Sequence, residues 1–185
     1  MEFQAESESV PLTVEQEAGL KQIAIRRCRG DLAKIVDGQS DADAFAYLPR
    51  AAVAAFHLGE FEHARRFAER ALALAPSFNR NWNYGNALHL GHTVLGLLAI
   101  KSGDIPAAVA ELARSAETPG SPQLNTFGPT MQLAKAVLRA GESEPVLEYV
   151  RRVRNFWEMG TTWLDLREQK ITSGQVPNCF QHSFA

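Results

Sequence analysis

Hydrophobic residues recur along this chain at intervals of three and four positions, which places them on one face of an α-helix. The pattern is clearest over residues 59–76, where small residues form a narrow stripe: Ala64, Ala68 and Ala71. Gly59 suits the end of the preceding helix, and Pro76 ends the following one. We therefore predict a helical hairpin over residues 44–76. A hairpin of this kind has to stack on neighbours to bury its apolar faces.

Two more glycines, Gly103 and Gly141, stand between similar helical patterns and predict hairpins over residues 83–118 and 129–159. When the three hairpins are aligned on their turn glycines, one column after the turn is apolar throughout: Ala64, Ala108 and Val146. A second column precedes the turn and holds the pairs Leu95-Gly96 and Leu133-Ala134, in which the small second residue lets two helices approach closely. The repetition predicts a stack of three related hairpins.

Further segments flank this stack within one expected domain, residues 1–185. They are a flexible acidic arm, a capping helix, a closing helix and a tail: residues 1–10, 13–37, 161–172 and 173–185. Thr13 and Gln16 have the spacing of a capping box, which favours a helix start at this point. Pro49 either begins or kinks the first helix of the first hairpin, and the sequence leaves both open.

Over residues 44–158 these patterns resemble the tetratricopeptide-repeat (TPR-like) superfamily. The resemblance implies an all-α fold: a TPR-like helical-repeat stack of three helical hairpins with an N-terminal capping helix and a C-terminal closing helix. The chain departs from the family pattern at the positions where a first-helix tryptophan is usual: Leu48, His92 and Thr130. The run GSPQLNTFGP, residues 120–129, also looks like a segment of bacterial repeat proteins, which favours a bacterial origin.

Composition and charge narrow the class of protein. With 45% hydrophobic and 22% charged residues the chain has an ordinary globular composition. A net charge of −2 does not favour nucleic acid, because phosphate binding needs a clustered basic surface. No apolar run reaches the roughly 20 residues of a membrane span. Cys28 and Cys179 lie far apart, which is typical of a reducing compartment. We expect a cytoplasmic protein that binds neither nucleic acid nor membrane.

The resemblance also implies a concave groove lined by the first helices of successive hairpins. Its expected lining is mostly apolar with one charge: Val53, Phe56, Leu90, Thr93, Leu97, Met131 and Lys135. The chaperone-binding members of the superfamily clamp a C-terminal carboxylate with a basic, asparagine-rich groove, and one lysine cannot do this. We therefore expect an amphipathic helix, an apolar peptide or a hydrophobic small molecule. The chain's own tail, through Phe180 and Phe184, is an alternative occupant.

Polar side chains gather over residues 77–93, where helical spacing brings several of them to one face. With a residue of the turn before the third hairpin, they outline a candidate pocket: Asn83, Tyr84, Asn86, His89 and Asn125. Three interpretations of the histidines stay open. His89 and His92 can together ligate a metal ion, or His89 can act as a general acid–base on a bound molecule. Alternatively, His92 is a hydrogen-bonded core residue and His89 lies at the groove edge.

From these patterns we expect a non-catalytic binding or adaptor protein that holds a peptide, a helix or a partner protein in the groove. Neither a nucleophile–histidine–carboxylate arrangement nor a phosphate-binding glycine loop is visible. Cys179 and His182 form only half a zinc site, so no cofactor or metal is expected. The alternative is a small-molecule-binding protein or small enzyme with a pocket around Asn86 and His89. A third possibility is a self-assembling homo-oligomeric scaffold with exposed tryptophans, Trp157 or Trp163, between chains. Otherwise these two tryptophans seal the end of the stack.

Overall fold

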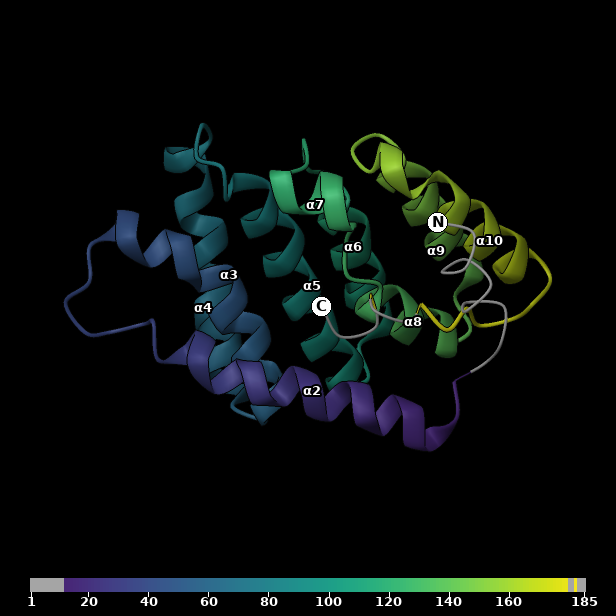
Figure 1. Ribbon diagram of the computed structural model, residues 1–185, viewed down its shortest axis with the longest axis horizontal. Coiled ribbons are helices and arrows are strands. Elements are labelled where there is room, and N and C mark those ends of the chain that lie inside the picture. Colours follow the sequence, from purple (N-terminus) through teal and green to yellow (C-terminus); the bar gives the residue numbers. More distant parts are fainter. Residues whose placement is uncertain (1–11, 180–181, 183–185) are drawn as a thin grey trace.

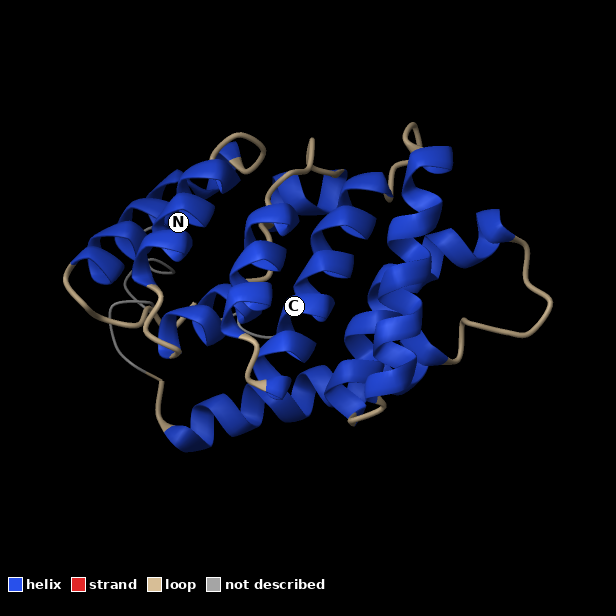
Figure 2. Ribbon diagram, turned by 180° about the vertical axis from the view of Figure 1, so that it is seen from behind, coloured by secondary structure: helices blue, strands red, loops and turns tan. Residues whose placement is uncertain are grey.

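Helices make up all the regular structure of residues 12–179 and 182, the part of the chain that the computed structural model describes (Figures 1 and 2). Its α-helices are α2 Val14–Leu32, α3 Asp41–Leu58, α4 Phe61–Leu74, α5 Tyr84–Ser102, α6 Ile105–Ser115, α7 Pro122–Phe127, α8 Gln132–Arg139, α9 Ser143–Val153 and α10 Thr161–Thr172. Two short 3-10 helices are η1 Ala75–Phe78 and η2 Glu158–Gly160. The all-α prediction is confirmed. The predicted arm, Phe180 and Phe184 lie outside the described residues.

Glycine turns join three pairs of packed helices: α3 with α4, α5 with α6, and α8 with α9. Gly59 and Gly103 have φ angles of 83° and 80°, a region in which a side chain would be strained. Each turn glycine donates its N–H to carbonyls of the helix's last turn, which satisfies groups that would otherwise lack a partner. Gly141, with φ of 97°, occupies the turn between α8 and α9. The three helix ends predicted at glycine are therefore confirmed.

A small residue brings α5 and α8 together, as the aligned columns predict. A Cβ atom at Gly96 would lie 2.4 Å from Cδ2 of Leu133, so any larger residue would force the Leu133 side chain to move. Behind the turns, the other predicted column is buried inside the pairs: Ala64, Ala108 and Val146. The residues of both columns therefore lie where helices contact one another.

The third hairpin is shorter than predicted, and its start explains why. Thr130 and Met131 precede α8 in non-helical backbone, because the Thr130 N–H donates to Nε2 of His89 and the Met131 N–H donates to the carbonyl of His182. These partners are distant in sequence and outcompete the local helix. The six-residue α7 was not predicted at all. It begins where the Ser121 hydroxyl accepts from the Leu124 N–H and Pro122 occupies the first turn.

Pro49 lies inside α3 rather than at its start. A proline has no N–H, so the carbonyl of Phe45 loses its usual helical donor. The Asn83 side chain supplies that donor: its Nδ2 lies 2.8 Å from the Phe45 oxygen and 3.2 Å from the Ala46 oxygen. Asn83, predicted to line a pocket, is instead buried and holds α3 against the start of α5.

The sequence predicts that α2 caps the first hairpin. In the structure α2 instead extends across several helices. It packs on α3, and Figure 1 shows it running past the ends of α3, α4 and α5 toward α8. Its capping box forms as predicted, with Thr13 and Gln16 bonded to each other's backbone N–H. Further along, Glu17 accepts from Lys135 and Arg139 of α8 at 3.2 and 2.9 Å. The chain's own helix thus covers the groove predicted for a partner.

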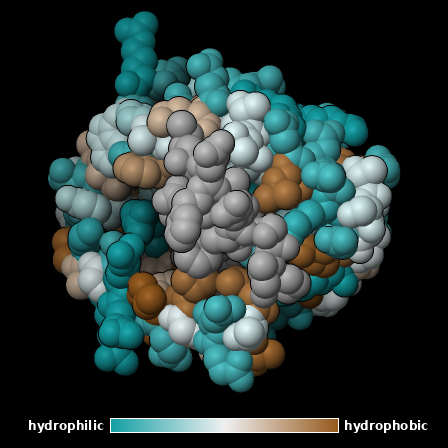
Figure 3. Space-filling model, turned by 45° about the vertical axis from the view of Figure 1, so that its right-hand side comes forward, coloured by the Kyte–Doolittle hydropathy of each residue, from teal (hydrophilic) through white to brown (hydrophobic). Residues whose placement is uncertain are grey.

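The described residues of the C-terminal segment contact α8 and α10, because the Asn178 carbonyl accepts from Lys135 and the His182 ring accepts from Arg167. The ring of His182 lies 4.9 Å from that of Trp157 and 5.8 Å from that of Trp163, measured between centroids. Both tryptophans are buried, so they seal the end of the stack and are not available between chains. Exposed large hydrophobic residues are scattered over several elements: Val14, Ile23, Val36, Tyr47, Trp82, Phe127, Met159 and Val176. On the face drawn in Figure 3, hydrophobic patches are likewise interrupted by polar residues.

Candidate functional site

A cavity of about 520 Å³ lies between α2, α3, α5 and α7. Its apolar wall comes from α2, α3, α5 and α7: Leu20, Ile23, Ala24, Val53, Ala54, Leu90, Leu124 and Phe127. Ile23 and Phe127 are 49% and 70% exposed, so they mark the mouth of the cavity. A cavity of this size and lining suits a small organic molecule.

Four of the residues predicted to bind a ligand meet in this cavity: Val53, Asn86, His89 and Leu90. Phe56 and Leu97 line a more open hollow at the other end of α2, beside its first turns. The remaining predicted residues line neither space: Asn83, Tyr84, Thr93, Asn125, Met131 and Lys135. The predicted groove is therefore divided by α2 into two separate spaces.

His89 is a core residue, not the groove-edge residue that one of the three interpretations expected. It borders the cavity, yet none of its surface is accessible to solvent. Its Nδ1 lies 3.0 Å from the Ser115 carbonyl, and its Nε2 accepts from the Thr130 N–H at 3.1 Å. The carbonyl partner places the proton on Nδ1. Burial lowers the pKa of His89 from 6.5 to about 4, so the ring is neutral at pH 7.

This bonding leaves His89 no lone pair for a metal ion or for proton transfer. His92 has the opposite setting, since its side chain is 20% exposed and its Nδ1 lies 2.7 Å from Oε2 of Glu111. The third interpretation, with His92 in the core and His89 at the groove edge, is therefore the reverse of their observed settings. The described residues contain no group of three or more His, Cys, Asp or Glu side chains placed to hold a metal.

Asn86 connects α5 to α7 through a closed hydrogen-bond network. Its Nδ2 donates to Oδ1 of Asn83 and to Oε1 of Gln123, at 2.9 and 3.0 Å. Its Oδ1 accepts from the Ser121 hydroxyl at 2.7 Å. Asn125, expected to approach Asn86, reaches it only indirectly, because its Oδ1 accepts from the Ser121 N–H. This network holds α7 against α5, where α7 forms one side of the cavity.

The remaining predicted residues have packing roles. Met131 and Thr93 are buried, and Tyr84 packs beside the cluster around Phe45. Lys135 is buried, and its Nζ donates to Glu17 of α2 and to the Asn178 carbonyl of the C-terminal segment at 3.2 and 2.8 Å. The single charge expected in the groove thus binds the chain's own flanking segments.

His182 is engaged in the same way as His89. Its Nδ1 accepts from Nη2 of Arg167 at 2.9 Å, and its Nε2 donates to the Phe127 carbonyl at 2.7 Å. Burial, and then the charge of Arg167, lowers the pKa of His182 from 6.5 to about 4. The spacing of Cys179 and His182 therefore reflects a docked segment, not half of a metal site.

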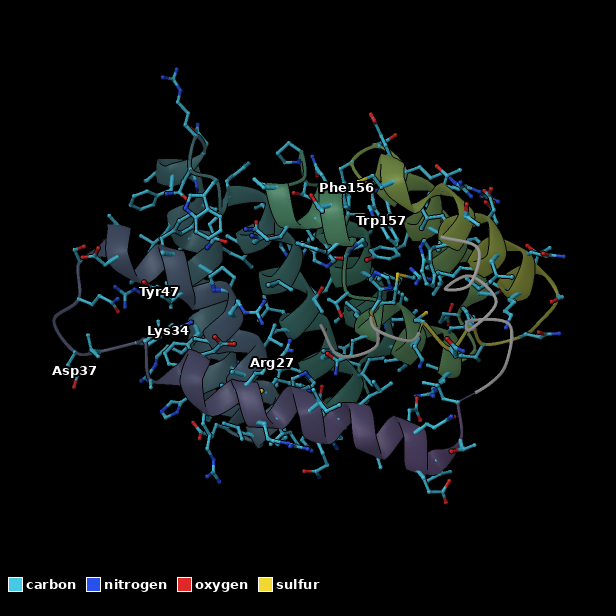
Figure 4. All side chains as sticks on the ribbon, viewed as in Figure 1. Arg27, Lys34, Asp37, Tyr47, Phe156 and Trp157 are labelled. Carbon is cyan, nitrogen blue, oxygen red and sulfur yellow. The ribbon has the colours of Figure 1, made fainter. Side chains whose placement is uncertain are left out.

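Charged residues of the cavity come from α2 and α3, and the sequence analysis did not select them. Arg27 and Asp31 stand on α2, and Arg50 stands on α3 (Figure 4 labels Arg27). On α2 the lining residues Leu20, Arg27 and Asp31 recur at helical spacing with Ile23 and Ala24. That spacing was a usable signal, because it puts one face of the helix toward the stack.

Comparison with protein-family models, with curated proteins and with solved structures gives no match for this chain. In the described part, no helix is both long and apolar enough to cross a membrane. The TPR-like resemblance therefore remains a prediction that rests on residue patterns.

Proposed function

We propose that the chain is a non-catalytic binding protein, built as a TPR-like stack, that holds one small and largely apolar molecule beneath α2. The observation that carries this proposal is the cavity of about 520 Å³ between α2, α3, α5 and α7. Its volume lies within the range of small-molecule sites, roughly 300–1,000 Å³. The bonding of His89 supports a binding role, because both of its ring nitrogens are occupied by hydrogen bonds within the protein.

A cavity-filling substitution tests this proposal. Val53→Phe places a larger side chain in the cavity, and Val36→Phe makes the same change at an exposed position between α2 and α3. The uncharged dye Nile red, titrated by fluorescence, is expected to bind the parent chain and the Val36→Phe variant with one site each. The Val53→Phe variant is expected to lose that site while it keeps its helical circular dichroism. Equal binding by both variants, or no saturable binding by the parent chain, would contradict the proposal.

A second candidate is the adaptor role that the sequence predicts, with a partner helix in the place of α2. It is favoured by the exposure of α2, on which Cys28 is the only buried residue. Glu17→Lys should release α2 by placing like charges beside Lys135 and Arg139. That variant is then expected to bind a labelled peptide of residues 12–38 in trans, and not a peptide with Leu20→Glu and Ala24→Glu. Failure to bind the unaltered peptide would contradict the adaptor role.

A further inference from the structure

The charged groups at the cavity do not balance one another. Asp31 is the only carboxylate among the described residues that line the cavity, and both its oxygens are occupied. Its Oδ1 accepts from Nζ of Lys34 at 3.2 Å and its Oδ2 from Nε of Arg50 at 3.3 Å. His57 adds no charge at neutral pH, because burial, and then the charge of Lys21, lowers its pKa. The cavity thus has one anion, Asp31, and three neighbouring cations: Arg27, Arg50 and Lys34.

Arg27 is the one of these three cations that does not pair with Asp31. Within the described residues it makes no ion pair, although it stands one turn before Asp31 on the same helix. A guanidinium presents donors in a planar fork that matches a carboxylate with two parallel hydrogen bonds. A positively charged ligand would instead depend on Asp31, which already forms ion pairs with Lys34 and Arg50.

We infer that the ligand is an amphipathic carboxylate: an apolar chain or ring held by Leu20, Val53 and Leu90, with its carboxylate bound by Arg27 at the cavity rim. This inference rests on the proposed small-molecule function and names the class of molecule. Arg50 contributes from α3, where its Nε remains on Asp31 and its Nη groups are further hydrogen-bond donors. The apolar wall provides affinity, and the guanidinium provides the preference for an anionic head.

Isothermal titration calorimetry with three probes tests the inference. The probes are decanoate, decanol and decylammonium, which share a ten-carbon alkyl chain and differ in the charge of the head group. Decanoate is expected to bind the parent chain most tightly of the three. Arg27→Gln should weaken decanoate binding about tenfold, as expected for a charged hydrogen bond at a partly solvated site, and leave decanol binding within twofold. The matched control is Arg26→Gln, which changes an exposed neighbour on α2 that does not line the cavity.

Two results separate the inference from the proposed function. If decanol and Nile red bind in the cavity but decanoate gains nothing over decanol, or Arg27→Gln leaves decanoate binding unchanged, the carboxylate inference is wrong and the proposed function stands. Tighter binding of decylammonium than of decanoate would also overturn the inference. If none of the probes binds the parent chain, both are wrong.

Discussion

The pairing of Asn83 with the carbonyl released by Pro49 makes a quantitative prediction about stability. Asn83→Ala leaves the Phe45 oxygen buried without its 2.8 Å donor, and it removes the acceptor of one Asn86 N–H. A buried polar group without a partner costs about 1–3 kcal/mol. We therefore expect Asn83→Ala to lower the free energy of unfolding by about 2–4 kcal/mol. Urea denaturation followed by far-UV circular dichroism measures this change.

The same substitution in a Pro49→Ala background isolates the physical cause. An alanine at position 49 has an N–H that can donate to Phe45 within α3, as a helical residue does. Asn83→Ala should therefore cost less there, by about 1–2 kcal/mol, and this coupling is read from a double-mutant cycle. Equal costs in the two backgrounds would refute the idea that Asn83 replaces the missing helical donor.

Three further predictions concern packing, pH and the cavity. Gly96→Ala should lower the free energy of unfolding by about 1–3 kcal/mol, because its Cβ meets Leu133, and chemical denaturation checks this. The pKa of His89 is about 4 in the folded chain and 6.5 in the unfolded chain, so as pH falls His89 is protonated in the unfolded chain before it is protonated in the folded one. Stability should fall between pH 6.5 and 4, by at most about 3 kcal/mol for this group, and His89→Gln should flatten the fall. Ser121→Ala removes the cap of α7 and a bond to Asn86, so Nile red affinity should fall several-fold, whereas unchanged affinity would show that α7 does not shape the cavity.

The sequence predicted those features that depend on neighbours along the chain. Turn glycines, the capping box at Thr13 and the closing helix α10, Thr161–Thr172, follow from local backbone chemistry. The predicted start of α8 was wrong because Thr130 donates to His89 and Met131 donates to His182. No local sequence pattern reveals these distant partners.

The candidate site was harder to predict because it depends on how helices face one another. Helix α5 is buried on several sides, so periodicity could not decide whether His89 or His92 points into the core. Asn83 was assigned to a pocket because its partner, the carbonyl of Phe45, is distant in sequence. The path of α2 depends on Glu17 reaching α8, an ion pair between segments that lie far apart along the chain.

The most direct test of a ligand site beneath α2 is the position of a bound molecule. In methyl-labelled protein, nuclear Overhauser effects from decanoate should reach the methyl groups of Leu20, Val53 and Leu90, which belong to three different helices around one cavity. Effects confined to exposed methyl groups such as those of Val14 and Val176, or no intermolecular effects at saturation, would contradict the account.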